Sequence, residues 1–535
     1  MTRLFTLVFL IISIYCSAQR KLCLIKADKI ISCDSNDSIY NWVLIKDGRI
    51  KRLGKGEFKS NERIKTIEYN GVIYPGFIDA HCHFAAFALD KYKCSLYNTT
   101  SYIEIIKKLV AYNKSNQYGW IYGVGWNEKN WVKKELPTKD LLDSLFPNKP
   151  VILKRVDGHT VLCNQKALEL VNITPRDTVL YKNFLGVNKS GVLTGILKED
   201  LVEKIDASVG RIHNKAAKEA LKKMEQYFFK NGLCTLVECG IDSLTQNLEQ
   251  QLYNKKQLSI GNYYFTKGGF FPQGQQNNHN NFLFKGIKVY LDGTLGSKSA
   301  CLLDYYLNSN QKGSLLVERK QLLKLCSLAI NNNWQLAIHA IGDSANRVAL
   351  KTMGFYTEGK DIRWRIEHAQ VVDSEDYQLF YKYSIIPSVQ PSHAISDHAW
   401  IENTLHINSI KNAYQYKNLL NQLGWMPLGT DFPVEDINPI NTFYSASFGS
   451  DIKKDDDPVV INPISRINAL KGMTIWAAKS VFEENNIGSI EIGKKANFTI
   501  LSTDLLTDNQ DKIKNTVVVS TIVNGKEVYK KGSNQ

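Results

Sequence analysis

The most constraining feature of this chain is a pair of histidines, His81 and His83, separated by one residue at the end of an apolar run. The apolar residues of 73–78, interrupted at Pro75, indicate a buried strand that leads into the pair. Residues i and i+2 of a strand point to the same face, so both imidazoles project together while Cys82 points away. Two neutral imidazoles at one strand end form half of a transition-metal site.

Three further apolar runs each end in a side chain of a type that binds metals. They are QLAIHAIGD with His339, RWRIEHAQV with His368, and WMPLGTDFPVED with Asp431. The spacing from His339 to His368 matches one strand–helix repeat, and that from His368 to Asp431 about two. A single histidine in such a run is more often a hydrogen-bonded core residue than a ligand. The complete set in this register predicts a metal site instead.

Side chains so far apart in sequence meet in a parallel β/α barrel, whose catalytic groups lie at the carboxyl ends of different strands. Eight strand-like runs favour this fold. The first run ends near His83, and the next three lie within PVILKRVDGH, LCTLVECGID and GIKVYLDGT. The last four runs end near His339, His368, Gln390 and Asp431. The chain between the first and fourth runs is longer than ordinary repeats need, which predicts long insertions after strands one and two. The predicted fold class is α/β, a (β/α)8 TIM barrel with long insertions on its active-site face.

The two ends of the chain predict a second, smaller domain. Both ends alternate apolar and polar residues, and Asp47-Gly48 and Asn524-Gly525 mark hairpin turns within them. Strands that flank a barrel in sequence can pair in space, because domain termini often lie together. We therefore expect the two ends to form one structural β domain.

Residues 1–18 have the three regions of an export signal, with Arg3 before the apolar run LFTLVFLIISIY and small residues at 16–18. The run is too short to span a bilayer comfortably, and Tyr15 disfavours the alternative of a lipid anchor on Cys16. No later segment is long and apolar enough for a membrane helix, so we expect a soluble periplasmic or secreted enzyme. The predicted domains are a signal peptide at 1–18, a discontinuous β domain at 19–75 with 483–535, and the barrel at 76–482.

Composition indicates an ordinary globular chain, with 44% hydrophobic and 22% charged residues in a total of 535. The formal net charge of +15 comes from lysines spread along the chain, and segments such as KKELPTKD mix both signs. Without an arginine-rich arm or a basic aromatic platform, this charge does not indicate nucleic-acid binding. The ten cysteines include no CxxC pair. Disulfides remain open in an oxidising compartment, but we expect most cysteines to be buried as small apolar residues.

A series of short motifs, in order along nearly the whole mature chain, carries a specific resemblance. They are PGFIDAHCHF, GWNEKNW, RVDGHTVLCNQKAL, GVLTGILKED, KVYLDGTLGSKSA, IHAIGDSAN, RIEHAQ, PSVQPSH, GTDFPVEDINP and GSIEIGKKANFTIL. With these motifs the chain resembles the amidohydrolase superfamily, and within it the YtcJ-like group, amidohydrolase family 3. The resemblance implies metal-dependent hydrolysis, usually of a carbon–nitrogen bond other than a peptide bond. It also implies that the two chain ends form a discontinuous β-sandwich.

The resemblance assigns ligands for two divalent metals, and nitrogen-rich ligation favours zinc. It implies that His81 and His83 hold the first metal and that His339 and His368 hold the second. Asp431 is implied to lie beside the first metal as both ligand and proton shuttle.

Lys288, in GIKVYLDG, falls where many relatives use a lysine carboxylated by carbon dioxide to bridge two metals. A lysine in a dry barrel near two cations loses its proton and reacts as a free amine. Two alternatives remain open. Lys288 pairs as an ammonium with Asp292 or Glu238, or a single metal is bound beside an unmodified lysine.

The implied reaction is attack of a metal-activated hydroxide on an amide, formamide or cyclic amide, with Asp431 taking the proton and returning it to the leaving nitrogen. Serine nucleophile chemistry is disfavoured because the sequence has no GxSxG elbow. The alternatives are a non-catalytic, metal-stabilised barrel used for binding or signalling, and a mononuclear deaminase or isomerase on the same scaffold. A binding scaffold has no need of Asp431 or Lys288, which favours an enzyme acting on a small molecule.

The remaining motif residues indicate positions in the substrate pocket. Trp126 lies in the first predicted insertion, where tryptophan-rich loops supply apolar pocket walls. Asp157 and His159 follow the second predicted strand and His393 the seventh, and we expect them to hydrogen-bond the substrate. Loop packing or solvent contact is the alternative for each of them. Glu199 matches a family position without a role that the sequence reveals.

Overall fold

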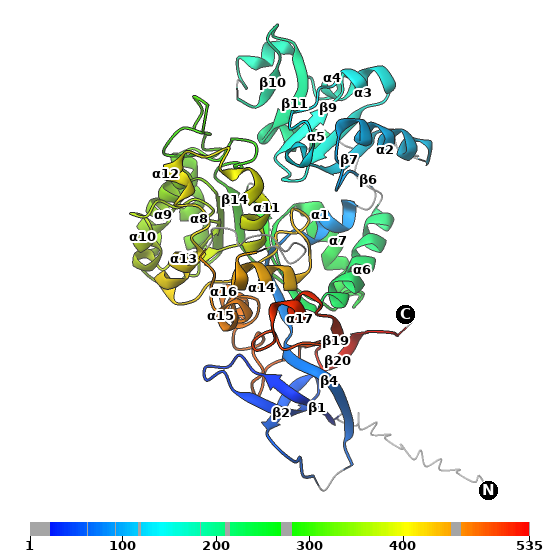
Figure 1. Cartoon of the computed structure of the whole chain (residues 1–535), viewed down its shortest axis with the longest axis vertical. Helices are drawn as coiled ribbons and strands as arrows, with labels where there is room; N and C mark the ends of the chain where they lie inside the picture. The colour runs from blue at the N-terminus through cyan, green and yellow to red at the C-terminus, as the bar shows by residue number, and fades with distance from the viewer. Residues whose placement is uncertain are drawn as a thin grey trace, which may run out of the picture.

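Three sheets organise the chain along the long axis of the molecule (Figure 1). A sheet built from both chain ends lies at one end, a parallel sheet lies in the middle, and an inserted sheet lies at the other end. This computed structural model describes residues 22–60, 63–90, 93–115, 119–181, 183–208, 214–268, 281–450 and 462–533. The predicted export signal lies outside the described residues.

The central sheet contains seven described strands, each paired in parallel with its neighbours. In sheet order they are β5 (Phe77–Cys82), β12 (Leu233–Ile241), β13 (Gly261–Lys267), β14 (Phe282–Tyr290), β15 (Gln335–Ala340), β16 (Arg365–His368) and β17 (Ile386–Ser388). Every residue of β5, β15 and β16 is buried, as expected of parallel strands covered on both faces. The sheet order follows the chain order, which is the arrangement of a β/α barrel.

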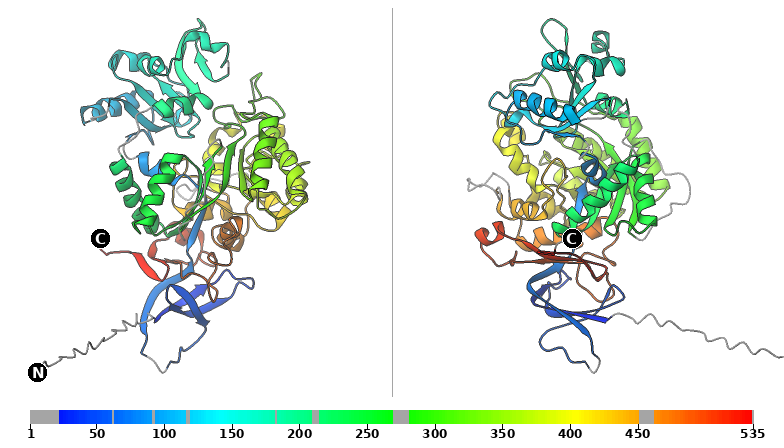
Figure 2. Two further views of the ribbon diagram at one scale, coloured as in Figure 1. Left: turned by 180° about the vertical axis from the view of Figure 1, so that it is seen from behind. Right: turned by 90° about the vertical axis from the view of Figure 1, so that its right-hand side faces the viewer.

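Helices lie around the outside of this sheet (Figures 1 and 2). They are α1 (Phe84–Asp90), α6 (Asn214–Lys230), α7 (Ser243–Asn254), α8 (Arg319–Asn331), α9 (Asp343–Thr357), α10 (Tyr377–Tyr383), α11 (Pro391–Ile401), α12 (Ile407–Ile410), α13 (Tyr416–Leu423), α14 (Pro439–Phe448), α15 (Arg466–Gly472) and α16 (Ile475–Ser480). Buried apolar residues of most of these helices join those of the strands in the largest hydrophobic core among the described residues. Ala477 and Ala478 of α16 instead pack in a separate cluster with residues of the barrel strands.

Residues 428–431 fill the gap between β17 and β5. Leu428 pairs in parallel with Val389, just beyond β17, and its carbonyl accepts a hydrogen bond from Ala80 N of β5 at 3.2 Å. The barrel is therefore nearly closed, and we call residues 428–431 its seam. Asp431 lies in this seam, where the eighth strand was predicted to end.

Two predictions about the barrel strands were wrong. PVILKRVDGH forms β8 (Val151–Arg155), which belongs to the inserted sheet. The barrel uses β13 instead, whose sequence GNYYFTK carries polar residues at both ends and gives no clear apolar run. Periodicity identifies a buried strand but not the sheet that it joins. The chain between α1 and α6 consequently forms one long insertion after β5, rather than insertions after strands one and two.

We call residues 94–208 the inserted module. Its sheet has the order β10 (Leu185–Val187), β11 (Leu193–Lys198), β9 (Thr160–Cys163), β8, β7 (Ile121–Trp126) and β6 (Cys94–Ser95). Its helices are α2 (Tyr102–Ser115), α3 (Asp140–Leu145), α4 (Gln165–Leu170) and α5 (Asp200–Ser208), with the 3-10 turns η1 (Glu128–Asn130) and η2 (Pro175–Thr178). Two hydrophobic clusters belong to this module alone, so it packs around its own core.

The third sheet joins the two ends of the chain. Its order is β20 (Lys526–Lys530), β19 (Val518–Val523), β18 (Phe498–Leu501), β4 (Lys65–Pro75), β1 (Leu22–Ile31), β2 (Ile39–Lys46) and β3 (Arg49–Gly54), with α17 (Gln510–Lys514) between β18 and β19. Pairing of β18 with β4 confirms that the two ends meet in space. The predicted sandwich is not confirmed, because the described strands form a single mixed sheet. The domain boundaries at 75/76 and 482/483 stay a prediction.

Both predicted hairpin turns are present in this sheet. Asp47 and Gly48 join β2 to β3 with φ of 52° and 78°, and Asn524 and Gly525 join β19 to β20 with φ of 50° and 73°. Two successive left-handed residues form the turn type whose twist matches paired strands, and Asp-Gly and Asn-Gly adopt it at low cost.

The described cysteines behave as small apolar residues. All nine of them are free, and seven of these are buried. Across the ranges that the structure describes, no helix has both the length and the apolar character required to cross a lipid bilayer.

Candidate functional site

The predicted ligands converge at the carboxyl ends of the barrel strands. His81 is the second-to-last residue of β5, and His83 directly follows this strand. His339 and His368 are near the ends of β15 and β16. Lys288 lies in β14. Parallel strands bring their carboxyl ends to one face of a barrel, which explains how side chains from separate repeats meet.

Asp431 is at the centre of this group. One of its oxygens, Oδ1, lies 3.0 Å from His83 Nε2 and 3.5 Å from His81 Nε2. The other, Oδ2, lies 3.9 Å from His368 Nδ1. Burial opposes the charge of Asp431, but the surrounding imidazoles hold the pKa of its carboxyl well below its usual range. The side chain is therefore an anion at neutral pH.

The imidazole rings continue from this centre toward β15. The ring centroids of His81 and His368 are 4.8 Å apart, and those of His368 and His339 are 4.5 Å apart. Lys288 Nζ lies 3.5 Å from His81 Nε2. The six residues predicted as metal ligands are thus brought together, while their function as ligands stays a prediction.

Two of these residues have a strained backbone. The φ of His368 is 75° and that of Asp431 is 60°, a left-handed conformation that is uncommon outside glycine. Such strain persists where the surrounding structure imposes it, and it clusters at functional sites. Among the six predicted ligands, it occurs at His368 and Asp431, whose side chains face each other.

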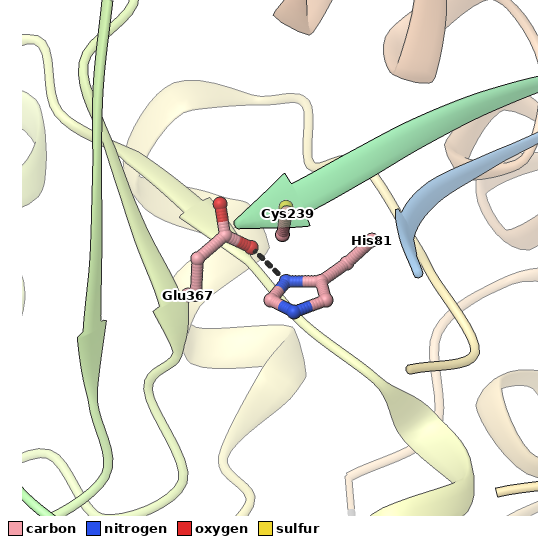
Figure 3. Close-up of side chains that lie close together, drawn as sticks. All are labelled: His81, Cys239 and Glu367. Carbon is pink, nitrogen blue, oxygen red and sulfur yellow. Dashed lines mark hydrogen bonds and ion pairs between the residues drawn. The ribbon is translucent and has the colours of Figure 1, made fainter. Parts of the chain in front are cut away.

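A buried carboxylate fixes the orientation of His81. Glu367 Oε2 lies 2.5 Å from His81 Nδ1 (Figure 3). The other oxygen of Glu367 pairs with Arg365 Nε. Burial alone would raise the pKa of Glu367, but Arg365 and His81 lower it far below the usual carboxyl range. Since an ionised carboxylate only accepts, Nδ1 of His81 donates, and Nε2 is directed toward Asp431.

The donor set fits a divalent cation. Burial lowers the pKa of His81 to about 4, and it lowers those of His339 and His368 well below the usual histidine range. All three rings are therefore neutral, as metal ligands must be. The buried Nδ1 of His368 has no hydrogen-bond partner among the described residues. Side chains of His81, His368 and Asp431 place ligand atoms within 4.8 Å of one another.

Cys239 and Glu367 form a second compact group with His81, but this group is a poorer fit (Figure 3). Glu367 already holds Arg365 and His81, and Cys239 Sγ accepts from Arg365 Nη2 at 3.3 Å. Because a cation in this group would lie against the Arg365 guanidinium, we assign the group to orienting His81.

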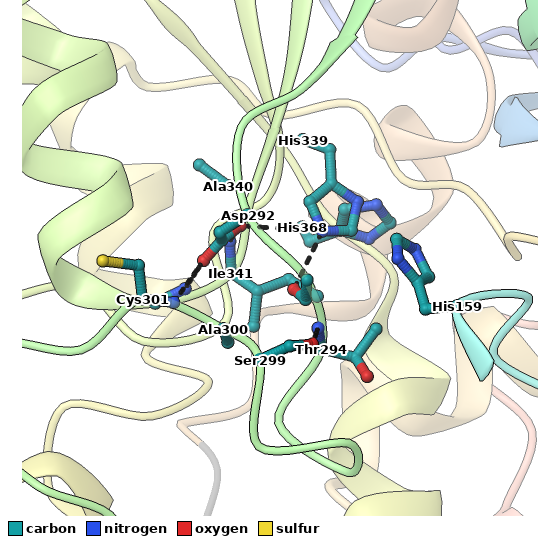
Figure 4. Close-up of polar contacts among 12 residues, drawn as sticks. His159, Asp292, Thr294, Ser299, Ala300, Cys301, His339, Ala340, Ile341 and His368 are labelled. Atoms are coloured by element: carbon teal, nitrogen blue, oxygen red, sulfur yellow. Dashed lines mark hydrogen bonds and ion pairs between the residues drawn. The ribbon is translucent and has the colours of Figure 1, made fainter. Parts of the chain in front are cut away.

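Lys288 is fully buried, and burial lowers the pKa of its ammonium. The two carboxylates proposed as alternative partners are engaged elsewhere. Asp292 accepts hydrogen bonds from the backbone N–H groups of residues 301, 341 and 342 (Figure 4), and Glu238 accepts from Ala85 N and Asn262 Nδ2. This environment favours the unprotonated amine that carboxylation requires.

A cavity of about 550 Å³ opens above these side chains, between the barrel and the inserted module. Its wall includes aromatic rings from both parts of the chain, among them Tyr97 of the module and Tyr290 and Trp400 of the barrel. The volume is that of a small-molecule pocket.

Three of the four predicted pocket residues line this cavity: Asp157, His159 and His393. Asp157 is engaged by the protein itself, since its Oδ2 binds Arg155 Nη1 at 2.5 Å and its Oδ1 accepts from His159 N at 3.1 Å. Trp126 is elsewhere. It is fully buried in the core of the inserted module, where its Nε1 donates to Leu153 O at 2.8 Å.

His393, in the first turn of α11, bridges two carboxylates. Its Nε2 lies 3.1 Å from Asp431 Oδ2, and its Nδ1 lies 3.4 Å from Glu435 Oε1. Burial opposes a charge on the ring, but hydrogen bonds with both carboxylates raise the pKa of His393 to about 10. His393 therefore holds the carboxylate of Asp431 in place.

Sequence reasoning missed the residues that orient the ligands. Arg365 and Glu367 alternate with buried apolar residues in β16, and two charges inside an apolar run are the signal that was available. Glu435 gave no such signal, because it lies in an irregular segment after the seam.

Comparison with known proteins agrees with this geometry. Residues 69–529 match the model of the amidohydrolase family. The chain belongs to the amidohydrolase family. Membership supports metal-dependent hydrolysis as the general class of reaction.

Curated relatives of this amidohydrolase are similar over almost their whole length. Protein LONG AFTER FAR-RED 3 of Arabidopsis thaliana is 30% identical, covering 94% of this chain and 90% of that protein. Putative amidohydrolase YtcJ of Bacillus subtilis (strain 168) is 26% identical, covering 93% and 97%. N-substituted formamide deformylase of Arthrobacter pascens is 22% identical, covering 95% and 98%.

A solved structure shares the fold. The crystal structure of an uncharacterized metal-dependent hydrolase from Pyrococcus horikoshii OT3 superposes with a TM-score of 0.72 at 24% identity, covering 92% of this chain and 99% of that one. The inserted module and the terminal sheet are thus included in the shared architecture.

Proposed function

We propose that this amidohydrolase cleaves a carbon–nitrogen bond other than a peptide bond, in a small amide, formamide or cyclic amide. The observation that carries the proposal is the position of Asp431, which faces three imidazoles from the ends of two strands, β5 and β16, and also lines the cavity. The similarity to a formamide deformylase supports a substrate of this class.

The family resemblance supplies the proposed metal ligands, and their convergence at one face of the barrel supports the assignment. His81 and His83 would hold one cation with Asp431, and His339 and His368 a second, with a carboxylated Lys288 between them. A divalent cation bound there, which we propose to be zinc, would polarise the substrate carbonyl and make a water molecule more acidic.

Asp431 moves the proton in the proposed reaction. Its carboxylate is ionised and faces the cavity, so it can accept a proton from the attacking water and deliver it to the leaving nitrogen. His393, whose ring is itself paired with Glu435, holds the carboxylate in place during both transfers. The inserted module supplies one wall of the cavity in which this proton transfer would occur.

The experiment compares wild type with Asp431→Asn after loading with zinc or manganese. Hydrolysis of a panel of amides, formamides, hydantoins and lactones is measured by product formation. We expect the wild type to cleave at least one C–N substrate and Asp431→Asn to lose at least about 100-fold in kcat. Asp511→Asn, an exposed position in α17, is the control and should match wild type. Equal activity of Asp431→Asn and wild type would refute the proton shuttle.

We also infer export of the chain, with cleavage between Ala18 and Gln19. Mass spectrometry of protein recovered from the periplasm or medium should then give a mature chain that starts at Gln19. Retention of residues 1–18 would contradict this.

A further inference from the structure

A partly buried polar network joins the inserted module to the barrel beside the site. It connects His159 and Glu199 of the module with Thr294 and Ser299 of the barrel segment that follows β14. Glu199 Oε2 lies 2.7 Å from His159 Nδ1, and Glu199 Oε1 accepts a hydrogen bond from Ser299 Oγ at 2.6 Å. The hydroxyl of Ser299 in turn accepts from Thr294 N at 3.0 Å.

Glu199 holds this position with a strained backbone conformation. It follows the last residue of β11, is only 4% exposed, and has a left-handed φ of 51°. Its backbone N–H donates to His159 O at 3.0 Å, so the two residues are tied through backbone and side chain together. Strain of this kind persists where several contacts impose it.

Gly293 allows the module to approach this closely. A Cβ atom at position 293 would lie 1.9 Å from Ser299 Oγ and 2.5 Å from Glu199 Oε1. The carbonyl oxygen of Gly293 lies 3.1 Å from His339 Nε2. One peptide unit therefore contacts the module network on one side and a proposed metal ligand on the other.

The ring of His159 lies beside the proposed metal ligands (Figure 4). Its centroid is 5.2 Å from that of His339 and 6.0 Å from that of Tyr290. Because Nδ1 faces Glu199, the opposite edge of the ring carries Nε2 toward the cavity that His159 lines. This edge is on the His339 side of the site, whereas Asp431 contacts His81 and His83.

We propose, resting on the hydrolytic function above, that His159 is a catalytic residue that hydrogen-bonds the substrate through Nε2, and that Glu199 is the positioning residue that fixes its ring. The inserted module thereby supplies a working part of the active site in addition to a pocket wall. The competing explanation is that the pair only fastens the module to the barrel.

Lys198 separates the two explanations. Its ammonium donates to Ser297 O at 3.0 Å, so it ties the same module to the same barrel segment one residue away from Glu199. Lys198→Met therefore loosens the module without changing His159. His159→Asn does the reverse, because the Asn amide nitrogen can replace Nδ1 toward Glu199 while Nε2 is lost.

The first measurement is kcat and KM on the best substrate of the panel, with unfolding temperature as the check on folding. We expect His159→Asn to lose about 100-fold in kcat/KM and Glu199→Gln about 10-fold, mainly in kcat, with Lys198→Met within about twofold of wild type. If His159→Asn keeps wild-type activity while Asp431→Asn is inactive, the inference is wrong and the hydrolytic function stands. If Lys198→Met loses as much kcat/KM as His159→Asn, the pair of His159 and Glu199 only attaches the module to the barrel. If the wild type cleaves no substrate of the panel, the result contradicts both the proposed hydrolytic function and the role of His159 that rests on it.

The second measurement needs no activity. Nitrogen-15 NMR of histidine-labelled, metal-free protein should show a strongly deshielded Nδ1–H signal that disappears in His159→Asn and shifts in Glu199→Gln. An identical signal in Glu199→Gln and wild type would refute the positioning role of Glu199.

Discussion

Glu367 holds Nδ1 of His81 at 2.5 Å across the barrel, from a strand in the opposite half of the sequence. The contact turns Nε2 of His81 toward Asp431 and fixes the tautomer that a metal needs. We therefore predict that Glu367→Gln weakens metal binding by about 10–100-fold, measured by competition with a chelator. Glu483→Gln removes a carboxylate that pairs with Lys285 outside the site, and should bind metal as wild type does. Unchanged affinity in Glu367→Gln would show that the contact does not serve the metal.

Lys288 provides a test of how many metal ions the site holds. Its buried amine lies 3.5 Å from His81 Nε2, where a carbamate could bridge two cations. We expect two equivalents of metal in fully loaded wild type and about one in Lys288→Met, measured by elemental analysis. One equivalent in the wild type would instead support an unmodified lysine beside a single metal.

Gly429 sets the distance between the barrel seam and β5. A Cβ at this position would lie 2.5 Å from His81 N and 2.8 Å from His81 Cβ. Gly429→Ala must therefore push the seam away from His81, and we expect it to lower stability by about 1–3 kcal/mol and to weaken metal binding. Gly119→Ala is the matched control, because a Cβ there meets nothing within 4 Å. If Gly429→Ala unfolds in urea as the wild type does, the close approach of the seam to His81 is contradicted.

Glu225, on α6, lies away from the active site, and we predict that it makes the stability of the fold depend on pH. Burial raises the pKa of its carboxyl, although Ser259 N and Ile260 N donate to it. A raised folded-state pKa means that the folded chain binds more protons than the unfolded one between about pH 4.3 and the folded value. The stability that this group contributes is therefore present below that window and is lost as pH rises through it.

Glu225→Gln keeps the accepting oxygen and removes the charge. We expect its unfolding temperature to exceed that of the wild type at pH 8 and the difference to shrink toward pH 5. Glu219→Gln, at an exposed position of the same helix, should show no such trend. A difference that grows as pH falls would reverse the assigned sign.

The sequence alone was enough to predict a barrel and the residues that gather at its mouth. The strand ends at His81, His339 and His368 follow from apolar periodicity, because a parallel barrel brings such ends to one face. The hairpin turns at Asp47 and Asn524 follow from local backbone preference. These features depend on short segments, so the residues that specify them are adjacent in the chain.

Only the tertiary structure decided which sheet each strand joins and what orients the ligands. The run that forms β8 and the run that forms β13 are both buried, and their partners are chosen by packing over long distances that periodicity does not encode. The contacts of Glu367 with His81 and of Glu199 with His159 join segments whose registers are independent in sequence. A hydrogen bond of this kind depends on the position of both backbones to within about an ångström, and that precision arises only when the whole barrel and its inserted module have packed.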